Sequence, residues 1–384
     1  MKESIYNITV SDTPSAGWKT IYNLLTKEYV CIRNDIQLND SLPESYIQSL
    51  LHKGILILDS SEDYEKACSE YEKMCNSDVL SLTVFLTGVC NCKCTYCYET
   101  PWKIDDLKNP EVLSQRILDE LNSRGLRKFF ISFFGGDPLL NIPAIYRIAG
   151  LLHQNLQDRF SFSIVTNGTL LSDKDITAWL KLGLESIKVT VDGARNIHNG
   201  RRPYKNGNGT YDNIINNLAA ISGRLPIIIN IVLDQGVTDI SGLLNDLTEQ
   251  GIKAEFDLSF RDPLYLSDEE KSNLIVFFSE ELKRRGFVQH SAISHPHGAV
   301  CMRKQLNSYG CTDTTIYGCI GNLDSVLDVT GDFKSKDHIQ FPYRCKDCKY
   351  LPICFGGCVD KNDCNRSLFE IMVPALLKVY IVRA

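Results

Sequence analysis

Three cysteines, Cys90, Cys94 and Cys97, stand at C-x3-C-x2-C spacing directly after an apolar run that is predicted to be a strand. Three thiolates on one short loop can hold three irons of a [4Fe–4S] cluster, which usually takes four protein thiolates. The fourth iron would then be open to a small molecule. A structural zinc loop is the alternative, because cysteine clusters also bind zinc. Cys92 has the wrong spacing and is expected to be a bystander.

The distribution of the cysteines excludes several classes of protein. Of fifteen cysteines in 384 residues, four fall in 90–97 and eight in 301–364. Such clusters, with no signal peptide visible in Met1–Asn23, favour metal binding in a cytoplasmic protein over secreted disulfides. The net charge is −6 without a basic stripe, so no nucleic-acid partner is expected. No apolar run reaches 18 residues, so no membrane span is expected.

The middle of the chain alternates predicted strands with predicted helices. Asn109 and Pro110 form a helix-start signal, Gly125 ends that helix, and Ser172 with Asp175 starts another. Alternation of this kind predicts an α/β fold with a parallel sheet, whose sites lie at the carboxyl ends of the strands. The six predicted strands are Leu80–Leu86, Lys128–Phe134, Phe160–Val165, Glu185–Val191, Pro226–Leu233 and Lys253–Leu258. Two further helices are predicted at Tyr211–Ile221 and Ile240–Gln250.

Polar motifs follow successive predicted strands. Gly135-Gly136-Asp137-Pro138 follows the second, Thr166-Asn167-Gly168 the third and Asp192-Gly193 the fourth, with Arg202 close behind. Paired glycines let the backbone approach a ligand, and an arginine can pair with a carboxylate. Each motif alone is also a common turn. Their order at consecutive strand ends predicts one ligand site.

The cysteine loop with Tyr96, followed by the Gly-Gly-Asp-Pro motif, resembles the radical S-adenosylmethionine (SAM) enzymes. Asp137 departs from the glutamate that is usual in this family's motif. The resemblance implies an open (β/α)6 partial barrel and a [4Fe–4S] cluster on Cys90, Cys94 and Cys97. It also implies that SAM binds the open iron and is cleaved reductively to a 5′-deoxyadenosyl radical. The residues expected to bind SAM are Tyr96, Gly135, Gly136, Asp137, Pro138, Thr166, Asn167, Asp192 and Arg202.

A second cysteine group near the C-terminus resembles the SPASM module, which holds two auxiliary Fe–S clusters. Lys336 stands where that family has a cysteine, so the first auxiliary cluster has lost one usual ligand. Cys301 is the candidate replacement for that ligand. The alternatives are a first auxiliary cluster with an open iron, a smaller cluster or no cluster. For the cysteines of 345–358, zinc binding remains an alternative. The resemblance assigns Cys311, Cys319 and Cys358 to the first auxiliary cluster, and Cys345, Cys348, Cys354 and Cys364 to the second.

The N-terminal segment 1–78 has a different pattern, with a predicted hairpin at Thr20–Ile32, a helix at Leu42–Lys53 and a strand at Ile55–Leu58. This small α+β segment partly resembles the winged-helix element with which peptide maturases hold a leader peptide. A capping subdomain is the alternative. The expected domains are 1–78, a barrel over 79–290, a SPASM-like module over 291–365 and a helix over 366–384.

These resemblances imply an enzyme that modifies a ribosomally synthesised peptide by hydrogen abstraction, forming a thioether, another crosslink or a related product. The expected partners are a precursor peptide or protein and a reductant such as flavodoxin or ferredoxin. One alternative is a sulfatase-maturase-like enzyme that generates formylglycine, because 190–212 resembles those maturases. Another is a zinc-stabilised binding protein. No catalytic base is indicated.

Overall fold

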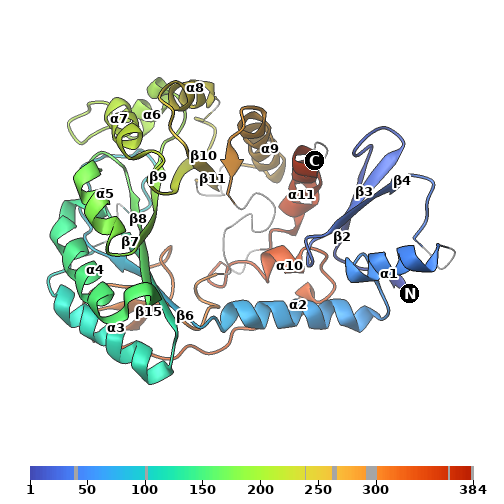
Figure 1. Ribbon diagram of the computed structural model, residues 1–384, viewed down its shortest axis with the longest axis horizontal. Helices are drawn as coiled ribbons and strands as arrows, with labels where there is room; N and C mark the ends of the chain where they lie inside the picture. The colour runs from blue at the N-terminus through green and yellow to red at the C-terminus, as the bar shows by residue number, and fades with distance from the viewer. Residues whose placement is uncertain are drawn as a thin grey trace.

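The computed structural model describes residues 1–38, 42–99, 103–237, 239–261, 266–290, 301–361 and 364–381. Its centre is a curved ten-stranded sheet in the order β12-β11-β10-β9-β8-β7-β6-β13-β14-β15 (Figure 1). The six predicted strands are confirmed, and they pair in parallel in chain order. They are β6 (Val79–Phe85), β7 (Lys128–Phe134), β8 (Phe160–Thr166), β9 (Leu184–Thr190), β10 (Ile227–Leu233) and β11 (Glu255–Phe260).

Helices cover the outer face of this sheet, as Figure 1 shows. The predicted start signal at Ser172 is confirmed, because its hydroxyl accepts from the Asp175 amide at 3.2 Å. Asn109 instead donates its side-chain amide to Asp313 at 3.2 Å, although it does precede the first turn. The helices of this layer are α3 (Pro110–Arg124), α4 (Ile142–Leu156), α5 (Asp173–Leu180), α6 (Arg195–Arg201), α7 (Tyr211–Ile221) and α8 (Ser241–Glu249).

The C-terminal cysteine region is continuous with the barrel sheet. Strand β13 (Ser308–Cys311) pairs in parallel with β6, and β14 (Ile316–Tyr317) and β15 (Val326–Asp328) extend the sheet in antiparallel pairs. At the other edge, the short strand β12 (Val288–Gln289) pairs with β11. The sequence did not predict this extension. It fixes the cysteines of the first predicted auxiliary site relative to the barrel.

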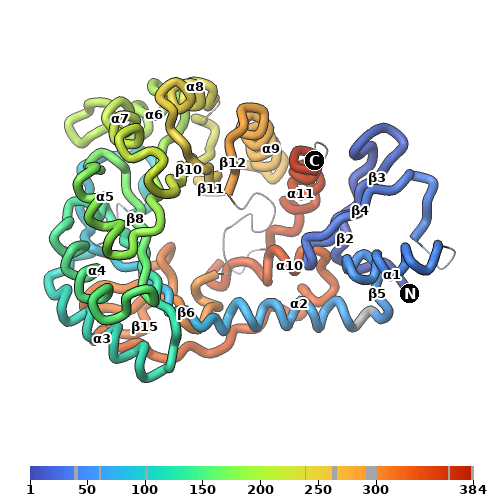
Figure 2. The backbone as a smooth tube through the Cα atoms, viewed as in Figure 1, coloured from blue at the N-terminus to red at the C-terminus, as the bar shows by residue number. Residues whose placement is uncertain are grey.

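The N-terminal segment forms a separate small sheet, β2 (Asn7–Ser11), β3 (Trp18–Asn23) and β4 (Tyr29–Arg33), in that order. The predicted hairpin is β3 and β4, and β2 is an additional strand. Figure 2 shows that helix α2 links this sheet to β6. The remaining elements of the segment are α1 (Glu44–His52), α2 (Ser60–Cys75) and the antiparallel pair β1 (Lys2–Glu3) and β5 (Leu56–Ile57).

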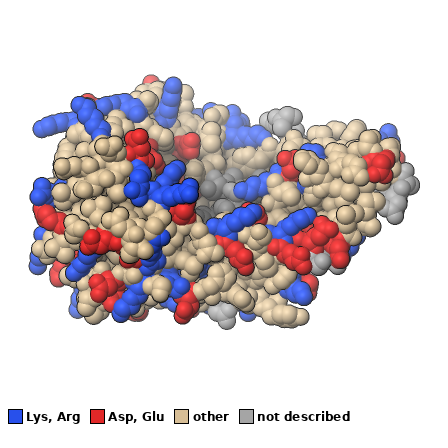
Figure 3. All heavy atoms as spheres, turned by 60° about the horizontal axis from the view of Figure 1, so that its bottom comes forward, with Lys and Arg blue, Asp and Glu red and all other residues tan. Residues whose placement is uncertain are grey.

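The last helix, α11 (Arg366–Ile381), packs against α9 (Asp268–Arg284) and against β2, so it lies between the barrel and the N-terminal sheet (Figure 2). A short helix, α10 (Leu351–Cys354), precedes it. Lys and Arg are interspersed with Asp and Glu over the face drawn in Figure 3. In the described residues, no helix is long and apolar enough to cross a membrane.

The face of the central strands that lies under the helices is fully apolar. In β10, Ile229 and Ile231 alternate on one face and are both fully buried. We expect Ile231→Ala to lower the free energy of unfolding by about 2–5 kcal/mol, because it leaves a cavity. Urea unfolding followed by circular dichroism would measure the change.

The matched control is Ile371→Ala on α11, where the side chain is 45% exposed. Its effect should stay within about 0.5 kcal/mol. Similar losses for the two variants would contradict the placement of β10 in the core.

Candidate active site

The predicted polar motifs meet at one edge of the sheet. The cysteine loop follows β6, Gly135-Gly136-Asp137-Pro138 follows β7, Thr166-Asn167 ends β8 and Asp192 follows β9. Because these strands are parallel neighbours, their carboxyl ends lie side by side. The Asn167 side chain connects two of the loops, donating to Asn91 Oδ1 at 2.7 Å and to Cys90 Sγ at 3.5 Å.

Backbone hydrogen bonds hold the cysteine loop against the segment 201–205. The amides of Lys93 and Thr95 donate to the carbonyls of Pro203 and Arg201 at 2.8 and 2.9 Å. Cys92 is buried and forms an isolated bridge with Tyr204. The structure therefore gives Cys92 a packing role, in keeping with its predicted bystander status.

The loop brings its three spaced thiols to one region. Cys90 and Cys94 are half-buried and Cys97 is exposed. A hydrogen bond from Cys92 lowers the pKa of Cys90, whereas burial raises the pKa of Cys94 to about 11. A coordinating thiol is deprotonated by the metal charge itself, so the high pKa of Cys94 is compatible with ligation.

The paired glycines allow the turn after β7 to touch the base of the cysteine loop. Gly135 and Gly136 have φ values of +90° and +47°, which favour glycine. A Cβ on Gly136 would lie 2.1 Å from the Val89 carbonyl oxygen. The Asp137 amide donates to that same carbonyl at 2.8 Å. No side chain fits between the two loops at this point.

Asp137 is fully buried, and its carboxylate accepts hydrogen bonds from three protein donors. It accepts from the Leu139 amide at 2.9 Å, the Asn167 amide at 2.9 Å and the Thr166 hydroxyl at 2.9 Å. Burial raises its pKa, against these hydrogen bonds. Pro138 begins the short 3-10 turn that Asp137 caps. Asp137 thus joins the ends of β7 and β8, and its contact with SAM stays a prediction.

Asp192 is also fully buried, and both of its carboxylate oxygens accept hydrogen bonds. One oxygen accepts from the Val232 amide at 3.0 Å, and the other accepts from the Tyr96 hydroxyl and from Arg201 Nε at 3.1 Å. Arg201 also pairs with Asp234, and its guanidinium carbon lies 4.6 Å from the Tyr96 ring centroid. Asp192 thus positions Tyr96, and it does so together with Arg201, which the sequence analysis missed.

His198 lies in α6, fully buried and hydrogen-bonded on both ring nitrogens. Its Nδ1 accepts from the Asp192 amide at 3.2 Å, which places the proton on Nε2, 2.9 Å from Thr210 Oγ1. The Thr210 hydroxyl in turn donates to the Arg202 carbonyl at 2.7 Å. Burial lowers the pKa of His198 to about 3, so it stays neutral.

Two charged side chains keep bonding capacity near the cysteine loop. Arg202 Nη1 donates to the Tyr96 hydroxyl at 2.7 Å, whereas its Nε is buried without a partner among the described residues. Glu99, which the sequence analysis did not select, accepts from the Gly136 amide at 2.7 Å. Burial raises the pKa of Glu99 to about 7.

The four thiols predicted for the second auxiliary cluster line a single pocket. Cys345 and Cys348 come from the turn after 342, Cys354 ends α10, and Cys364 precedes α11. None of the four is disulfide-bonded. In the described ranges, no three His, Cys, Asp or Glu side chains converge on a single-ion site. Four thiols around one pocket could hold a multi-iron cluster, with one thiolate per iron, and zinc remains the alternative.

The residues predicted for the first auxiliary cluster do not assemble in the same way. Cys311 is fully buried in β13, on the same sheet face as Tyr309, whose ring Arg124 of α3 approaches at 5.7 Å. Lys336 Nζ donates to the carbonyls of Met302 and Gln305 at 2.9 and 3.1 Å and also to that of Ser308. Lys336 is thus occupied by backbone carbonyls and Cys311 is packed inside the sheet, and the four-thiolate set stays a prediction.

Three of these cysteines do lie in one part of the module. Burial raises the pKa of Cys319, and nearby negative charge at Asp360 and Cys301 adds to the rise. Asn322 donates to the same Asp360 at 3.1 Å, which brings the segment containing Cys358 beside that containing Cys319. Cys301, Cys319 and Cys358 are half-buried.

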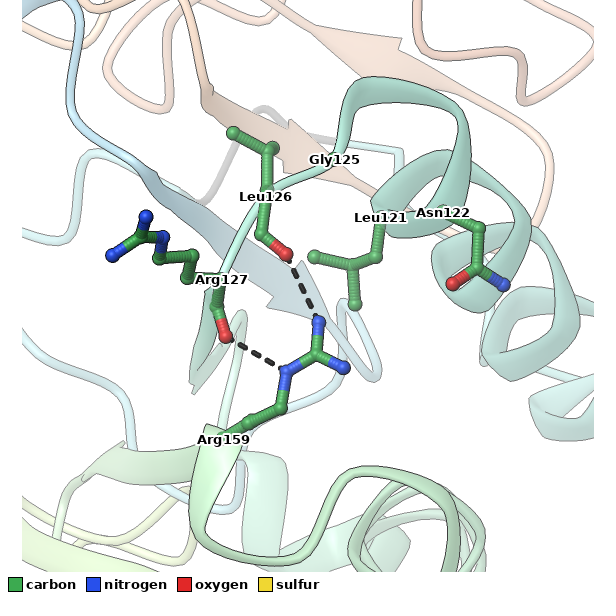
Figure 4. Close-up of a pocket in the computed structure, with 6 residues that line it drawn as sticks. All are labelled: Leu121, Asn122, Gly125, Leu126, Arg127 and Arg159. Carbon is green, nitrogen blue, oxygen red and sulfur yellow. Dashed lines mark hydrogen bonds between the residues drawn. The ribbon is translucent and has the colours of Figure 1, made fainter.

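A further hollow lies at the opposite edge of the sheet, where β7 and β8 begin, lined by Leu121, Asn122, Gly125, Leu126, Arg127 and Arg159 (Figure 4). The guanidinium of Arg159 donates to the carbonyls of Arg127 and Leu126 at 2.8 and 2.9 Å. Arg159 thereby fastens the loop after α3 to the start of β8. None of the predicted site residues lines this hollow.

Comparison with known proteins agrees with this geometry. The radical SAM superfamily matches residues 84–245. The radical SAM cyclopropyl synthase TigE of Paramaledivibacter caminithermalis is 21% identical over 93% of this chain and 85% of its own length. The cysteine-type anaerobic sulfatase-maturating enzyme of Clostridium perfringens is 22% identical over 76% of this chain and 95% of its own.

Solved structures show the same fold. The maturase anSMEcpe with bound AdoMet, which is SAM, has a TM-score of 0.60 at 20% identity, covering 78% of this chain and 98% of its own. SuiB of Streptococcus suis bound to the precursor peptide SuiA has a TM-score of 0.52 at 14% identity over 100% of both chains. Residues 84–245 therefore form a radical SAM domain, from a family that uses SAM and a [4Fe–4S] cluster.

Proposed function

We propose that this enzyme modifies a residue of a ribosomally synthesised peptide by hydrogen abstraction, with a thioether or other crosslink as the first candidate product. The observation that carries the proposal is the small N-terminal sheet beside the barrel. Its order is β2-β3-β4, and β2 packs against α11, so β4 is the edge on the other side. In the described residues, no strand pairs with that edge. An extended leader peptide can add to such an edge.

The relatives support a peptide substrate. SuiB, which resembles this chain over its full length, was solved with its precursor peptide. The sporulation killing factor maturation protein SkfB of Bacillus subtilis is 25% identical over 44% of this chain and 39% of its own length. TigE is named for forming a cyclopropyl group. Peptide maturation is therefore the substrate class that we assign.

The residues of the loop would hold the cofactors. Cys90, Cys94 and Cys97 would bind the [4Fe–4S] cluster, which supplies the electron that cleaves SAM to the hydrogen-abstracting radical. Arg202 has a buried guanidinium N–H without a partner among the described residues, which can contact SAM. The Asn167 side chain is bonded to Asn91, Cys90 and Thr169, so it would orient the loop around the ligand. Tyr96 fixes the Arg202 guanidinium, and Asp192 with Arg201 fixes Tyr96.

We also propose a single auxiliary cluster, on Cys345, Cys348, Cys354 and Cys364. Its pocket is complete, whereas the first auxiliary site lacks Cys311 and has an ammonium at Lys336. A flavodoxin or ferredoxin is the proposed electron donor. The proposed location is the cytoplasm, where thiols stay reduced.

The second candidate function is oxidation of a protein cysteine or serine to formylglycine. The observation that favours it is the higher TM-score to the SAM-bound maturase, 0.60 against 0.52 for SuiB. The maturase structure, however, covers 78% of this chain, and SuiB covers all of it.

Mass spectrometry separates these functions. We expect the full protein, incubated anaerobically with SAM, a reductant and the short peptide encoded beside its gene, to release 5′-deoxyadenosine and to change the peptide mass. Loss of about two hydrogens with a fragmentation-resistant segment indicates a crosslink. Conversion of a sulfatase peptide instead, with the neighbouring peptide untouched, would favour the maturase function.

The role of β4 can be tested with two neighbouring proline substitutions, Val30→Pro and Cys31→Pro. In an antiparallel strand, adjacent residues direct their amides to opposite sides. Only one of the two amides can therefore face the open edge, and its loss should weaken peptide binding while preserving the fold. Fluorescence anisotropy of the labelled peptide and thermal melting would measure both effects. If both proline variants fold and both bind the peptide as tightly as the wild type, β4 is excluded as the docking edge.

The number of clusters can be tested by iron and sulfide analysis of the reconstituted protein. We expect about 8 irons per chain, and about 4 after Cys345 and Cys348 are both changed to Ala. Cys311→Ala is the matched control and should keep about 8 irons, because Cys311 faces α3. About 12 irons in the wild type, with fewer in the Cys311 variant, would show that the first auxiliary cluster forms.

A further inference from the structure

Lys304 is a buried lysine that lies beside the cysteines of the C-terminal module. Only 2% of its surface is exposed, and its Nζ donates to the carbonyls of Phe355 and Gly357, the latter at 2.8 Å. Burial lowers the pKa of Lys304, and negative charge at Cys301, Cys354 and Cys345 opposes the fall. Because an ammonium is costly to bury, a position like this one needs negative groups around it.

The two carbonyls belong to an unusual turn directly after Cys354. Phe355 has a φ of +45°, and Gly356 and Gly357 have φ values of +85° and +70°. A left-handed backbone is disfavoured at a non-glycine residue, so it persists where the surroundings impose it. Here the Phe355 ring stacks on that of Tyr71, with centroids 5.5 Å apart, and its carbonyl is bonded to Lys304. The turn is therefore held from both sides.

This turn directs its amides to Cys354 and its carbonyls to Lys304. Burial raises the pKa of Cys354, and hydrogen bonds from the amides of Gly356 and Gly357 to its sulfur oppose the rise. The Gly356 amide and the Phe355 carbonyl are the two ends of one peptide group. Because hydrogen bonds in a chain polarise one another, an ammonium on the carbonyl strengthens the N–H bond to the sulfur.

We propose that Lys304 is a positioning residue that raises the reduction potential of the auxiliary cluster on Cys345, Cys348, Cys354 and Cys364. It acts through its buried charge and through the amides that it orients toward Cys354. Net charge and hydrogen bonds to sulfur both set the potential of an Fe–S cluster, and positive charge and N–H donors favour the reduced form. A higher potential makes the site a better electron acceptor. The inference rests on the proposed auxiliary cluster.

The test is the reduction potential of this cluster, followed by EPR spectroscopy during a potentiometric titration of the full-length chain. Changing Cys90, Cys94 and Cys97 to Ala removes the SAM cluster, so that the signal has one source. In this background, Lys304→Met removes the charge at similar side-chain length. We expect the affinity of the oxidised cluster for an electron to fall about tenfold, a shift of about 59 mV to lower potential. The reason is that a unit charge buried near the cluster is weakly screened.

Two variants serve as controls. Lys304→Arg keeps the charge and the N–H donors, and it should retain most of the original potential. Lys361→Met removes an exposed lysine of the same module and should not shift the potential, because solvent screens that charge. Lys304→Gln is a second neutral variant, with the same expected shift as Lys304→Met, and it replaces that variant if the methionine prevents iron loading.

The outcomes are distinct. An unchanged potential in the iron-loaded neutral variant would overturn the proposal, because Lys304 would then only fasten the turn. Equal shifts in Lys304→Met and Lys361→Met would also overturn it, because any positive charge of the module would then act alike. Zinc or no metal in the background with Cys90, Cys94 and Cys97 changed to Ala would refute the auxiliary cluster itself, and the metal analysis distinguishes that failure from a failure of Lys304.

Discussion

The parallel pairing of β6, β7, β8 and β9 is the constraint on which the site depends. It delivers four loops to one edge, but loops of this kind need further bonds to hold a fixed geometry. Asp137 supplies such bonds between β7 and β8, and Asn167 connects β8 to the cysteine loop. A buried carboxylate is tolerated when protein donors replace water, and Asp137 accepts from the Leu139 and Asn167 amides and the Thr166 hydroxyl.

Arg201 and Arg202 are adjacent in sequence but have different roles: Arg201 holds the loop in place, and Arg202 can contact a ligand. Arg201 is enclosed with Asp192 and Asp234, and removing one partner of such a buried set typically costs about 3–5 kcal/mol. Arg202 donates to the Tyr96 hydroxyl and retains a buried N–H without a partner among the described residues. Tyr96 lies between them, bonded to Arg202 through its hydroxyl and stacked under Arg201 through its ring. The position of the ligand-facing arginine therefore depends on the structural one.

The sequence predicted what local patterns encode. The alternation of apolar strands with helices predicted the six central strands, with ends within a few residues of those observed, and Ser172 predicted the start of a helix. Long-range pairing was not predictable: β13 adds to β6 although Ser308 lies more than two hundred residues beyond Ser81, its partner in register. Glu99 was missed for a related reason, since only the packed turn brings it to Gly136. The burial of Asp137 and Asp192 also depends on tertiary contacts that no motif specifies.

Lys336 shows what replaces a metal ligand in such a module. Its ammonium joins the carbonyls of Met302, Gln305 and Ser308 and lies 4.4 Å from the Tyr309 ring centroid. A cation bound by several carbonyls can fix a turn, as a cluster ligand would, and cation–π contact adds to its stabilisation. An ammonium cannot carry an electron, however. If the first auxiliary cluster is absent, as we propose, electron transfer beyond the SAM cluster falls to the pocket of Cys345, Cys348, Cys354 and Cys364, beside α10 and α11.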